Sequence, residues 1–310
     1  MGTAVTDIIG PLFGIMVAGY LAGRFRLLNE GAGAILSRFV FVVALPALIF
    51  VSLSRVPVEE FFDWPFLGAL GGGMSIIFCL AVLVARFAFP GSLTAHGLHG
   101  LTAMFSSTGY IGLPLILIAF GDVALVPGII GAVITGALFL PIGIVLAEVD
   151  RGKGKASIVV SLLLGLVRNP VLLATVAGLL SSGLGLSIPG PITTFFDLLG
   201  GAFIPCALFS AGLFLVGSSV RGEALEIGWL VFAKLVLHPL VTWWLAYHVF
   251  ELEGVLPAIA VIQAALPSGV PVFVLAQQYK TFVARSNAAI FLSTALSVFS
   301  LSALIVFLGV

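Results

Sequence analysis

Charged residues are scarce in this sequence. They occupy only 8% of its 310 positions, and the formal net charge is zero. An average soluble protein carries about 25% charged residues, so the composition excludes an ordinary water-soluble protein. The chain also lacks a basic cluster interleaved with aromatic residues, and we expect no nucleic-acid partner.

Cysteine and histidine are rare as well. The two cysteines, Cys79 and Cys206, both fall inside apolar runs, where a thiol packs as a small apolar group, and they predict no disulfide framework. The four histidines are scattered along the chain. No carboxylate pair, metal-ligand cluster, nucleophile elbow or phosphate-binding loop accompanies them, so the sequence indicates neither an enzyme nor a metal or cofactor site.

Long apolar runs dominate the chain instead. Hydrophobic residues make up 61% of it, and its mean hydropathy is +1.27. A helix crosses the hydrocarbon layer of a membrane with roughly 20 apolar residues, and ten runs approach or exceed this length. We therefore predict an all-α membrane protein with ten transmembrane helices, over residues 8–22, 33–53, 65–88, 97–120, 124–148, 160–181, 192–217, 227–250, 254–278 and 283–309.

Positive charges alternate with these predicted spans. Lysine and arginine accumulate in the cytoplasmic segments of membrane proteins. In the connecting segments only Arg55 follows an even-numbered span. The others follow odd-numbered spans, namely Arg24, Arg26, Arg86, Arg151, Lys153, Lys155, Arg221, Lys280 and Arg285. Both the N-terminus and the C-terminus are therefore expected outside.

The first half of the sequence recurs in the second half. Gly112 and Pro114 match Gly269 and Pro271 at an offset of 157 positions. Two further matches share an offset of 159: Pro11 and residues 17–19 with Pro170 and residues 176–178, and Pro46 and Phe50 with Pro205 and Phe209. Three segments at nearly one offset indicate an internal duplication.

The duplication also predicts how the chain is organised. Each copy would cross the membrane five times, so the second copy must enter from the opposite side. Such a five-plus-five inverted repeat is typical of secondary transporters. We expect a first repeat at residues 1–149, a cytoplasmic linker at 150–158 and a second, inverted repeat at 159–310.

Glycine and proline interrupt the fourth and ninth spans. Both helices are expected to break there, and broken backbone at membrane depth is tolerated only where protein buries it or where it lines a wet cavity. The N-terminus of a half-helix presents free N–H groups and partial positive charge, which suits a carboxylate. The alternative is a purely structural kink. The candidate substrate-binding residues are Ser107, Thr108, Gly109, Gly112, Pro114, Pro267, Ser268, Gly269 and Pro271.

Four ionisable residues inside spans are further candidates, because charge within a membrane is costly and often functional. Lys234 is a candidate substrate ligand or counter-ion, although it could instead snorkel toward the interface. His238, one turn later, is a candidate proton carrier or an internal hydrogen-bonding group. Asp197 and Glu148 are also candidate proton carriers, and their alternatives are a water-exposed anchor and a solvated helix end, respectively. For Asn169 the simpler interpretation is a helix cap.

At these segments the sequence resembles the auxin efflux carrier family, which includes plant PIN carriers and bacterial malate or malonate permeases. The resemblance covers essentially the whole chain. It rests on STGYIGLPLILIAFG, RNPVLLATVAGLL, IPCALFSAGLFL, KLVLHP and PSGVPVFVLAQQY in this order.

The resemblance implies the fold shared by PIN carriers and bile-acid symporters, in which the broken fourth and ninth helices cross. It implies a scaffold of helices 1, 2, 6 and 7, a moving core of helices 3, 4, 5, 8, 9 and 10, and a homodimer. Organic acids would bind by a carboxylate near the crossing. One departure is Ser107, where family members often have asparagine. The long cytoplasmic loop of plant carriers is missing, which favours a bacterial permease of the inner membrane.

Our hypothesis from the sequence is a secondary transporter of small organic anions that works by elevator-like alternating access, coupled to protons or driven by the membrane potential. A sodium-coupled symporter of the bile-acid type is the first alternative, and the few hard oxygen ligands near the breaks speak against it. The second alternative is a membrane receptor that does not transport, for which the sequence offers no signalling domain.

Overall fold

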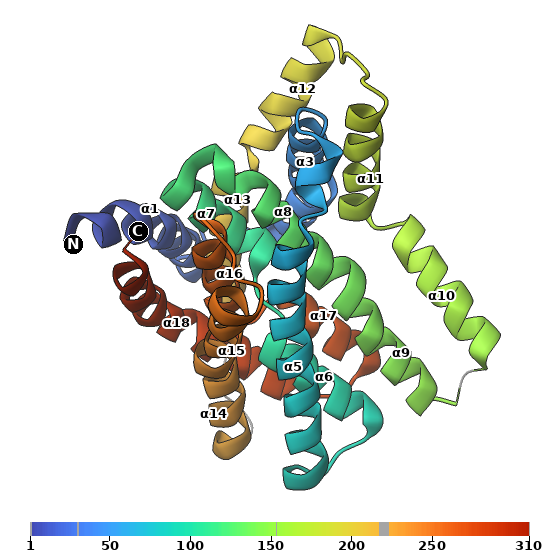
Figure 1. Ribbon diagram of the computed structural model, residues 1–310. Helices are drawn as coiled ribbons and strands as arrows, with labels where there is room; N and C mark the ends of the chain where they lie inside the picture. The colour runs from blue at the N-terminus through green and yellow to red at the C-terminus, as the bar shows by residue number, and fades with distance from the viewer. Residues whose placement is uncertain (1, 30, 153, 217–222, 310) are drawn as a thin grey trace. The chain divides into compact units, whose positions relative to one another are not determined.

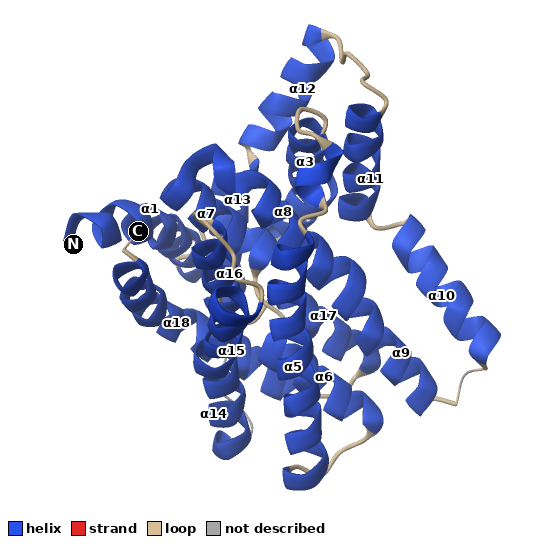
Figure 2. Ribbon diagram, in the orientation of Figure 1, coloured by secondary structure: helices blue, strands red, loops and turns tan. Residues whose placement is uncertain are grey.

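The structure is a computed structural model that describes residues 2–29, 31–152, 154–216 and 223–309. Lys153 and Arg221, which contributed to the predicted topology, lie outside the described residues. Helices make up nearly all of the described chain (Figure 2), and its one isolated β-bridge joins Ser106 and Ser268. The all-α prediction is confirmed for this part of the chain.

Six helical segments are long and apolar enough to cross a membrane, and a seventh is formed if α10 (Lys155–Val167) and α11 (Pro170–Gly183) make one span. The six are Ala32–Leu53, Val58–Ala88, Thr108–Asp150, Gly190–Leu215, Ala224–Val249 and Val283–Leu308. A protein with several membrane-spanning helices is thus supported, while the ten-helix inverted arrangement stays a prediction.

The chain divides into two compact units. Unit 1 comprises Met1–Asp63, Gly109–Val133 and Val167–Gly217. Its helices are α1 (Gly2–Arg24), α2 (Ala32–Phe39), α3 (Leu45–Leu53), α4 (Val58–Phe61), α7 (Leu113–Phe120), α8 (Leu125–Val133), α11, α12 (Gly190–Gly201) and α13 (Phe203–Leu215), with the short helical turns η1 (Val40–Ala44) and η3 (Gly121–Ala124).

Unit 2 comprises Trp64–Thr108, Ile134–Leu166 and Ser218–Val310. Its helices are α5 (Trp64–Ala88), α6 (Leu93–Met104), α9 (Leu140–Asp150), α10, α14 (Ala224–Phe232), α15 (His238–Trp244), α16 (Leu256–Ala265), α17 (Val270–Tyr279) and α18 (Val283–Leu308). The π-helical turns η4 (Ile134–Phe139), η5 (Ala233–Leu237) and η6 (Leu245–Val249) continue these helices, and α5 packs along α6 (Figure 1).

Two close helix contacts in unit 1 involve residues that the repeat relates. A Cβ atom on Gly19 of α1 would overlap the carbonyl oxygen of Phe209 in α13. A Cβ atom on Gly178 of α11 would lie 3.0 Å from the carbonyl oxygen of Phe50 in α3. Small residues let membrane helices approach backbone to backbone. The matched residues of the two copies therefore make equivalent contacts.

Four prolines inside helical segments each follow a π-helical turn. A proline ring clashes with the carbonyl of the preceding turn, and a π-helical turn widens the helix at that point. Such turns end two residues before Pro46, Pro114, Pro141 and Pro239, at η1, η2 (Thr108–Gly112), η4 and η5. The helical path therefore continues through these prolines.

Asn169 separates α10 from α11 and caps the second of these helices. Its side-chain oxygen accepts hydrogen bonds from the backbone N–H groups of Val171 at 3.0 Å and Leu172 at 3.3 Å. Pro170 follows at the first helical position, where a missing N–H costs nothing. The capping interpretation of Asn169 is confirmed.

Candidate binding site at two helix breaks

Two interruptions of helical backbone meet inside unit 2. Helix α6 ends at Met104, α16 ends at Ala265, and the residues that follow are extended. The N–H of Ser107 donates to the carbonyl of Pro267 at 2.9 Å, and the N–H of Gly269 donates to that of Phe105 at 2.9 Å. Each interruption thus satisfies backbone groups that the other leaves without a helical partner.

The break after α16 lies where the sequence predicts it. Pro267 disfavours helical geometry in the preceding Leu266, which is extended with ψ 152°. Pro271 occupies the second position of α17, where its missing N–H is tolerated. Gly269 is needed for close approach, because a Cβ atom there would come within 2.7 Å of the Phe105 ring.

The break after α6 lies earlier than the sequence predicts. The sequence predicts it at Gly112 and Pro114, but the backbone from Thr108 through Gly112 forms the π-helical turn η2 and continues into α7. This turn accommodates Pro114, and the interruption falls at residues 105–107. Ser107 is therefore part of the break and does not merely precede it.

The predicted binding residues divide between the two units. Gly109, Gly112 and Pro114 belong to unit 1, where Leu113 and Pro114 are buried at the start of α7. Those in unit 2 are Ser107, Thr108, Lys234, Pro267, Ser268, Gly269 and Pro271. The paired breaks bring Ser107 and Pro267–Gly269 together.

Ser268 ties its break to two further elements of unit 2. Its hydroxyl donates to the carbonyl of Thr102 in α6 at 2.7 Å. Its backbone N–H donates to the hydroxyl of Ser293 in α18 at 3.1 Å. The Ser268 hydroxyl is therefore a structural donor, and the hydrogen bonds of Ser268 help to hold the geometry of the break.

Lys234 is completely buried, with 0% of its surface exposed. Its Nζ atom donates to Ser106 Oγ at 2.7 Å and to the carbonyl of Ala264 at 2.6 Å, and it lies 2.9 Å from His238 Nδ1. These contacts match the three donors of an ammonium group. Within the described chain no carboxylate pairs with Lys234. The side chain reaches the paired breaks and does not snorkel to an interface.

Two polar atoms near Lys234 on the same helical path remain unsatisfied in the described structure. His238 Nε2 and Thr242 Oγ1 have no hydrogen-bond partner, although both residues are 0% exposed. Thr242 lies against Gly73 of α5, where a Cβ atom would overlap its hydroxyl. Buried polar groups normally have partners, so these two atoms are candidates for hydrogen bonds to a bound polar group.

The remaining candidates occupy different surroundings. Asp197, in unit 1, pairs with Arg55 at 2.7 Å, and about half of each side chain is exposed, at 46% and 52%. Glu148, in unit 2, is only 5% exposed and accepts a hydrogen bond from the Tyr279 hydroxyl at 2.7 Å. The anchor interpretation fits Asp197, whereas a solvated helix end does not describe Glu148.

Sequence reasoning missed several contacts of this region. Thr242 follows Lys234 by eight residues and His238 by four, so the helical period carried a signal that could have found it. The Ala264 carbonyl could not be found in this way, because its exposure to Lys234 follows from where α16 ends. Thr102 and Ser293 likewise become partners of Ser268 only through tertiary packing.

Comparisons with known proteins agree with the motifs. Residues 4–305 match the family model described as membrane transport protein. A Rhizobium meliloti protein named "Putative malonate transporter" is 33% identical over 310 residues, covering 97% of this chain and 95% of the relative. A Methanothermobacter thermautotrophicus transporter is 28% identical over 299 residues, with 96% of each chain covered. An Escherichia coli K12 transporter is 27% identical, with 91% of each chain covered.

Family matches of this length, together with several helices able to span a membrane, describe a multi-pass membrane protein. The relatives above are named as transporters. The chain therefore belongs to the membrane transport protein family, the auxin efflux carrier family that its sequence motifs resemble.

Proposed function

We propose that this protein is a secondary transporter of small organic anions and that a substrate carboxylate binds beside Lys234 at the two helix breaks. The observation that carries the proposal is a fully buried lysine without a carboxylate partner in the described structure. An unpaired charge inside a membrane protein is costly. An anionic substrate would supply the missing partner.

The neighbouring groups support a small, polar ligand. His238 Nε2 and Thr242 Oγ1 lack partners within the described residues. The half-helix α17 begins at Val270 without a side-chain cap, so the partial positive charge of its N-terminus is not offset by a side chain. These groups favour a carboxylate over a neutral or cationic substrate.

The relative from Rhizobium meliloti supports a substrate class. Its name mentions malonate, a small dicarboxylate. We therefore propose small carboxylates, with malonate as the first compound to test. Ser107 replaces the asparagine that is frequent in the family, so the preferred acid is expected to differ from that of asparagine-containing members.

The proposed mechanism is elevator-like alternating access. In it the predicted core, formed by the third, fourth, fifth, eighth, ninth and tenth of the predicted spans, would carry the substrate past a scaffold that forms a homodimer. Protons or the membrane potential would drive the movement across the inner membrane, with both termini outside. The division of the chain into two compact units supports such a movement, with the difference that residues 109–133 of the predicted fourth and fifth spans belong to unit 1, together with the predicted scaffold spans.

Uptake into proteoliposomes tests the proposal. Labelled malonate and other mono- and dicarboxylates are offered while pH and sodium gradients are imposed separately. We expect saturable uptake of at least one carboxylate. Lys234→Gln should weaken it about 10- to 100-fold, because hydrogen bonds to charged groups contribute roughly 1.5–3 kcal/mol.

Lys280→Gln is the matched control. Lys280 is exposed at the C-terminal end of α17, so its replacement should leave uptake unchanged. Undiminished uptake by the Lys234→Gln variant would show that the buried ammonium does not bind substrate. If no carboxylate is taken up by the wild-type protein, the proposed function is wrong.

A further inference from the structure

Three ionisable side chains from three helices meet in unit 2, away from the paired breaks. His99 lies in α6, Glu226 in the first turn of α14 and Arg285 in the first turn of α18. His99 Nδ1 is 3.1 Å from Glu226 Oε1, and Arg285 Nε is 3.1 Å from Glu226 Oε2. One carboxylate therefore lies between two basic groups.

The burial of this cluster is unusual for charged residues. The side chains of His99 and Glu226 are only 1% and 2% exposed, whereas that of Arg285 is 29% exposed. Buried charge is tolerated when it is paired. Arg285 supplies a permanent countercharge beside the Glu226 carboxylate, because guanidinium remains protonated in proteins.

The hydrogen-bond geometry identifies a free acceptor on His99; Glu226 Oε2, which pairs with Arg285 Nε, also has no hydrogen-bond partner among the described residues. An ionised carboxylate accepts hydrogen bonds only, so His99 Nδ1 must carry the hydrogen that faces Glu226. In neutral His99 the lone pair then lies on Nε2, which has no hydrogen-bond partner among the described residues. A proton can add to Nε2 without breaking the bond between His99 and Glu226.

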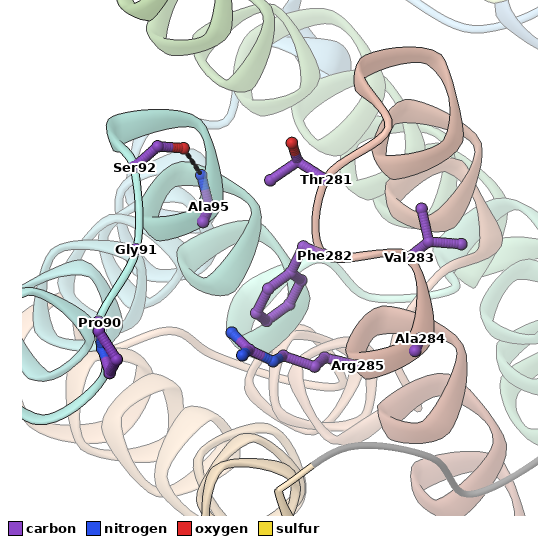
Figure 3. Close-up of a pocket in the computed structure, with 9 residues that line it drawn as sticks. All are labelled: Pro90, Gly91, Ser92, Ala95, Thr281, Phe282, Val283, Ala284 and Arg285. Carbon is purple, nitrogen blue, oxygen red and sulfur yellow. Dashed lines mark hydrogen bonds between the residues drawn. The ribbon is translucent and has the colours of Figure 1, made fainter.

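A pocket of about 390 Å³ lies next to the cluster. It is lined by the turn at residues 90–92, by Ala95 and by residues 281–285, which include Arg285. Figure 3 shows the Arg285 guanidinium beside the ring of Phe282, and the distance from its Cζ to the ring centroid is 5.6 Å. The same ring lies 5.8 Å from that of His99. Phe282 thus lines the pocket and also packs against the ring of the buried His99.

Other ionisable groups on the surrounding helices contact groups other than His99 or are exposed. Glu223 lies 3.9 Å from the outer side of the Arg285 guanidinium. Two further carboxylates accept hydrogen bonds, Asp150 from Thr94 and Glu148 from Tyr279. Among the basic groups, Lys234 donates to Ser106, and His96 Nε2 contacts the Phe89 carbonyl. Arg86 is exposed. Among the described ionisable groups, His99 therefore contacts Glu226, which in turn contacts Arg285.

We propose that His99 is the coupling-proton site of the transporter, with Glu226 and Arg285 as its positioning residues. Protonation adds a proton to His99 Nε2, and the reverse step releases it; the pocket meets the cluster at Arg285 and Phe282, and His99 is not among its lining residues. The cluster then changes from a neutral set, Glu226 with Arg285, to a set with one positive charge. Histidine is suited to this role because its charge changes in the physiological pH range. The proposal rests on the proposed transport of organic anions.

The competing interpretation is a structural ion-pair cluster that only ties α6, α14 and α18 together. It predicts that replacing His99 harms folding or all transport alike. A coupling site predicts selective loss of proton movement. Malonate counterflow at equal pH on both sides measures substrate exchange without net proton transfer, and a pH-sensitive dye reports the protons that accompany net malonate uptake.

The experiment compares wild-type protein, His99→Gln and His96→Gln in the same vesicles. His96 lies one turn earlier on α6 and bonds to a backbone carbonyl, so its replacement controls for loss of a buried imidazole. We expect His99→Gln to keep counterflow while substrate-dependent proton movement falls to the background of protein-free vesicles. His96→Gln should keep both activities. Wild-type proton movement in His99→Gln, or loss of counterflow together with proton movement, would overturn the proposal.

A second variant covers the case in which His99→Gln does not fold. Glu226→Gln removes the carboxylate charge with little change of shape, and it should also keep counterflow and lose proton movement. Retained proton movement in that variant rejects the proposal. If wild-type protein exchanges malonate but moves no protons with it, the coupling site is wrong and the transport function stands. Absence of any carboxylate flux in the wild type rejects the transport function itself.

Discussion

The backbone of α1 at Gly19 lies directly against the backbone of α13 at Phe209. The residues that match them in the repeat, Gly178 and Phe50, form the equivalent contact between α11 and α3. Duplication of the sequence is thus accompanied by duplication of a packing interaction within unit 1. The glycines are required at both places because the opposing atoms include backbone.

Gly19→Ala and Gly178→Ala should each destabilise the protein by about 1–3 kcal/mol, the usual cost of overpacking. Thermal unfolding in detergent measures the effect. Gly10→Ala is the control, because a methyl group at that position of α1 would have no packing neighbour within 4 Å. Equal melting temperatures for Gly19→Ala and Gly10→Ala would refute the close helix contact.

Ser268→Ala removes a buried hydrogen bond to the Thr102 carbonyl. We expect a loss of about 1 kcal/mol in the free energy of unfolding, together with slower carboxylate uptake, because a buried acceptor loses its donor. Ser75→Ala is the matched control, since the exposed Ser75 donates a similar 2.7 Å bond to the Gly71 carbonyl. Similar changes in the two variants would argue against a special role for Ser268.

Thr242→Val replaces a buried hydroxyl that has no partner in the described structure. Stability without substrate should stay the same or rise slightly, because no hydrogen bond is lost. Stabilisation by added malonate should decrease if the hydroxyl contacts the substrate. Differential scanning fluorimetry with and without malonate measures both effects, and unchanged stabilisation by malonate would exclude Thr242 from the binding site.

Asp197→Asn breaks the ion pair with Arg55, whose side chains are about half exposed. Exposed pairs contribute about 0–1 kcal/mol, so the melting temperature should hardly change. The pH profile of uptake should also match the wild type, because the coupling proton is assigned to His99. A shifted profile for Asp197→Asn would restore Asp197 as a proton carrier.

Apolar runs and prolines carried most of what the sequence could predict. The sequence predicts the break after α16 from Gly269 and Pro271, and the interruption lies at residues 266–269, directly before α17. The break after α6 was misplaced, because proline patterns do not reveal that a π-helical turn accommodates Pro114. A glycine followed two residues later by a proline therefore coincides with a helix break at Gly269 and Pro271 and with a π-helical turn at Gly112 and Pro114.

Contacts between residues far apart in the sequence could not be predicted. Asp197 lies 142 positions from Arg55, and Glu226 lies 127 positions from His99. Periodicity describes one helix at a time, so it placed Lys234 and His238 together but could not find Ser106. The scattered histidines looked uninformative for the same reason, although packing brings His99 to a carboxylate.

The paired breaks of unit 2 are fastened to each other by main-chain atoms of Phe105, Ser107, Pro267 and Gly269. These hydrogen bonds use main-chain atoms only, so they do not depend on the side chain of Ser107. Replacing the Ser107 side chain by another polar group would therefore change what is presented at the breaks without removing the hydrogen bonds that join them.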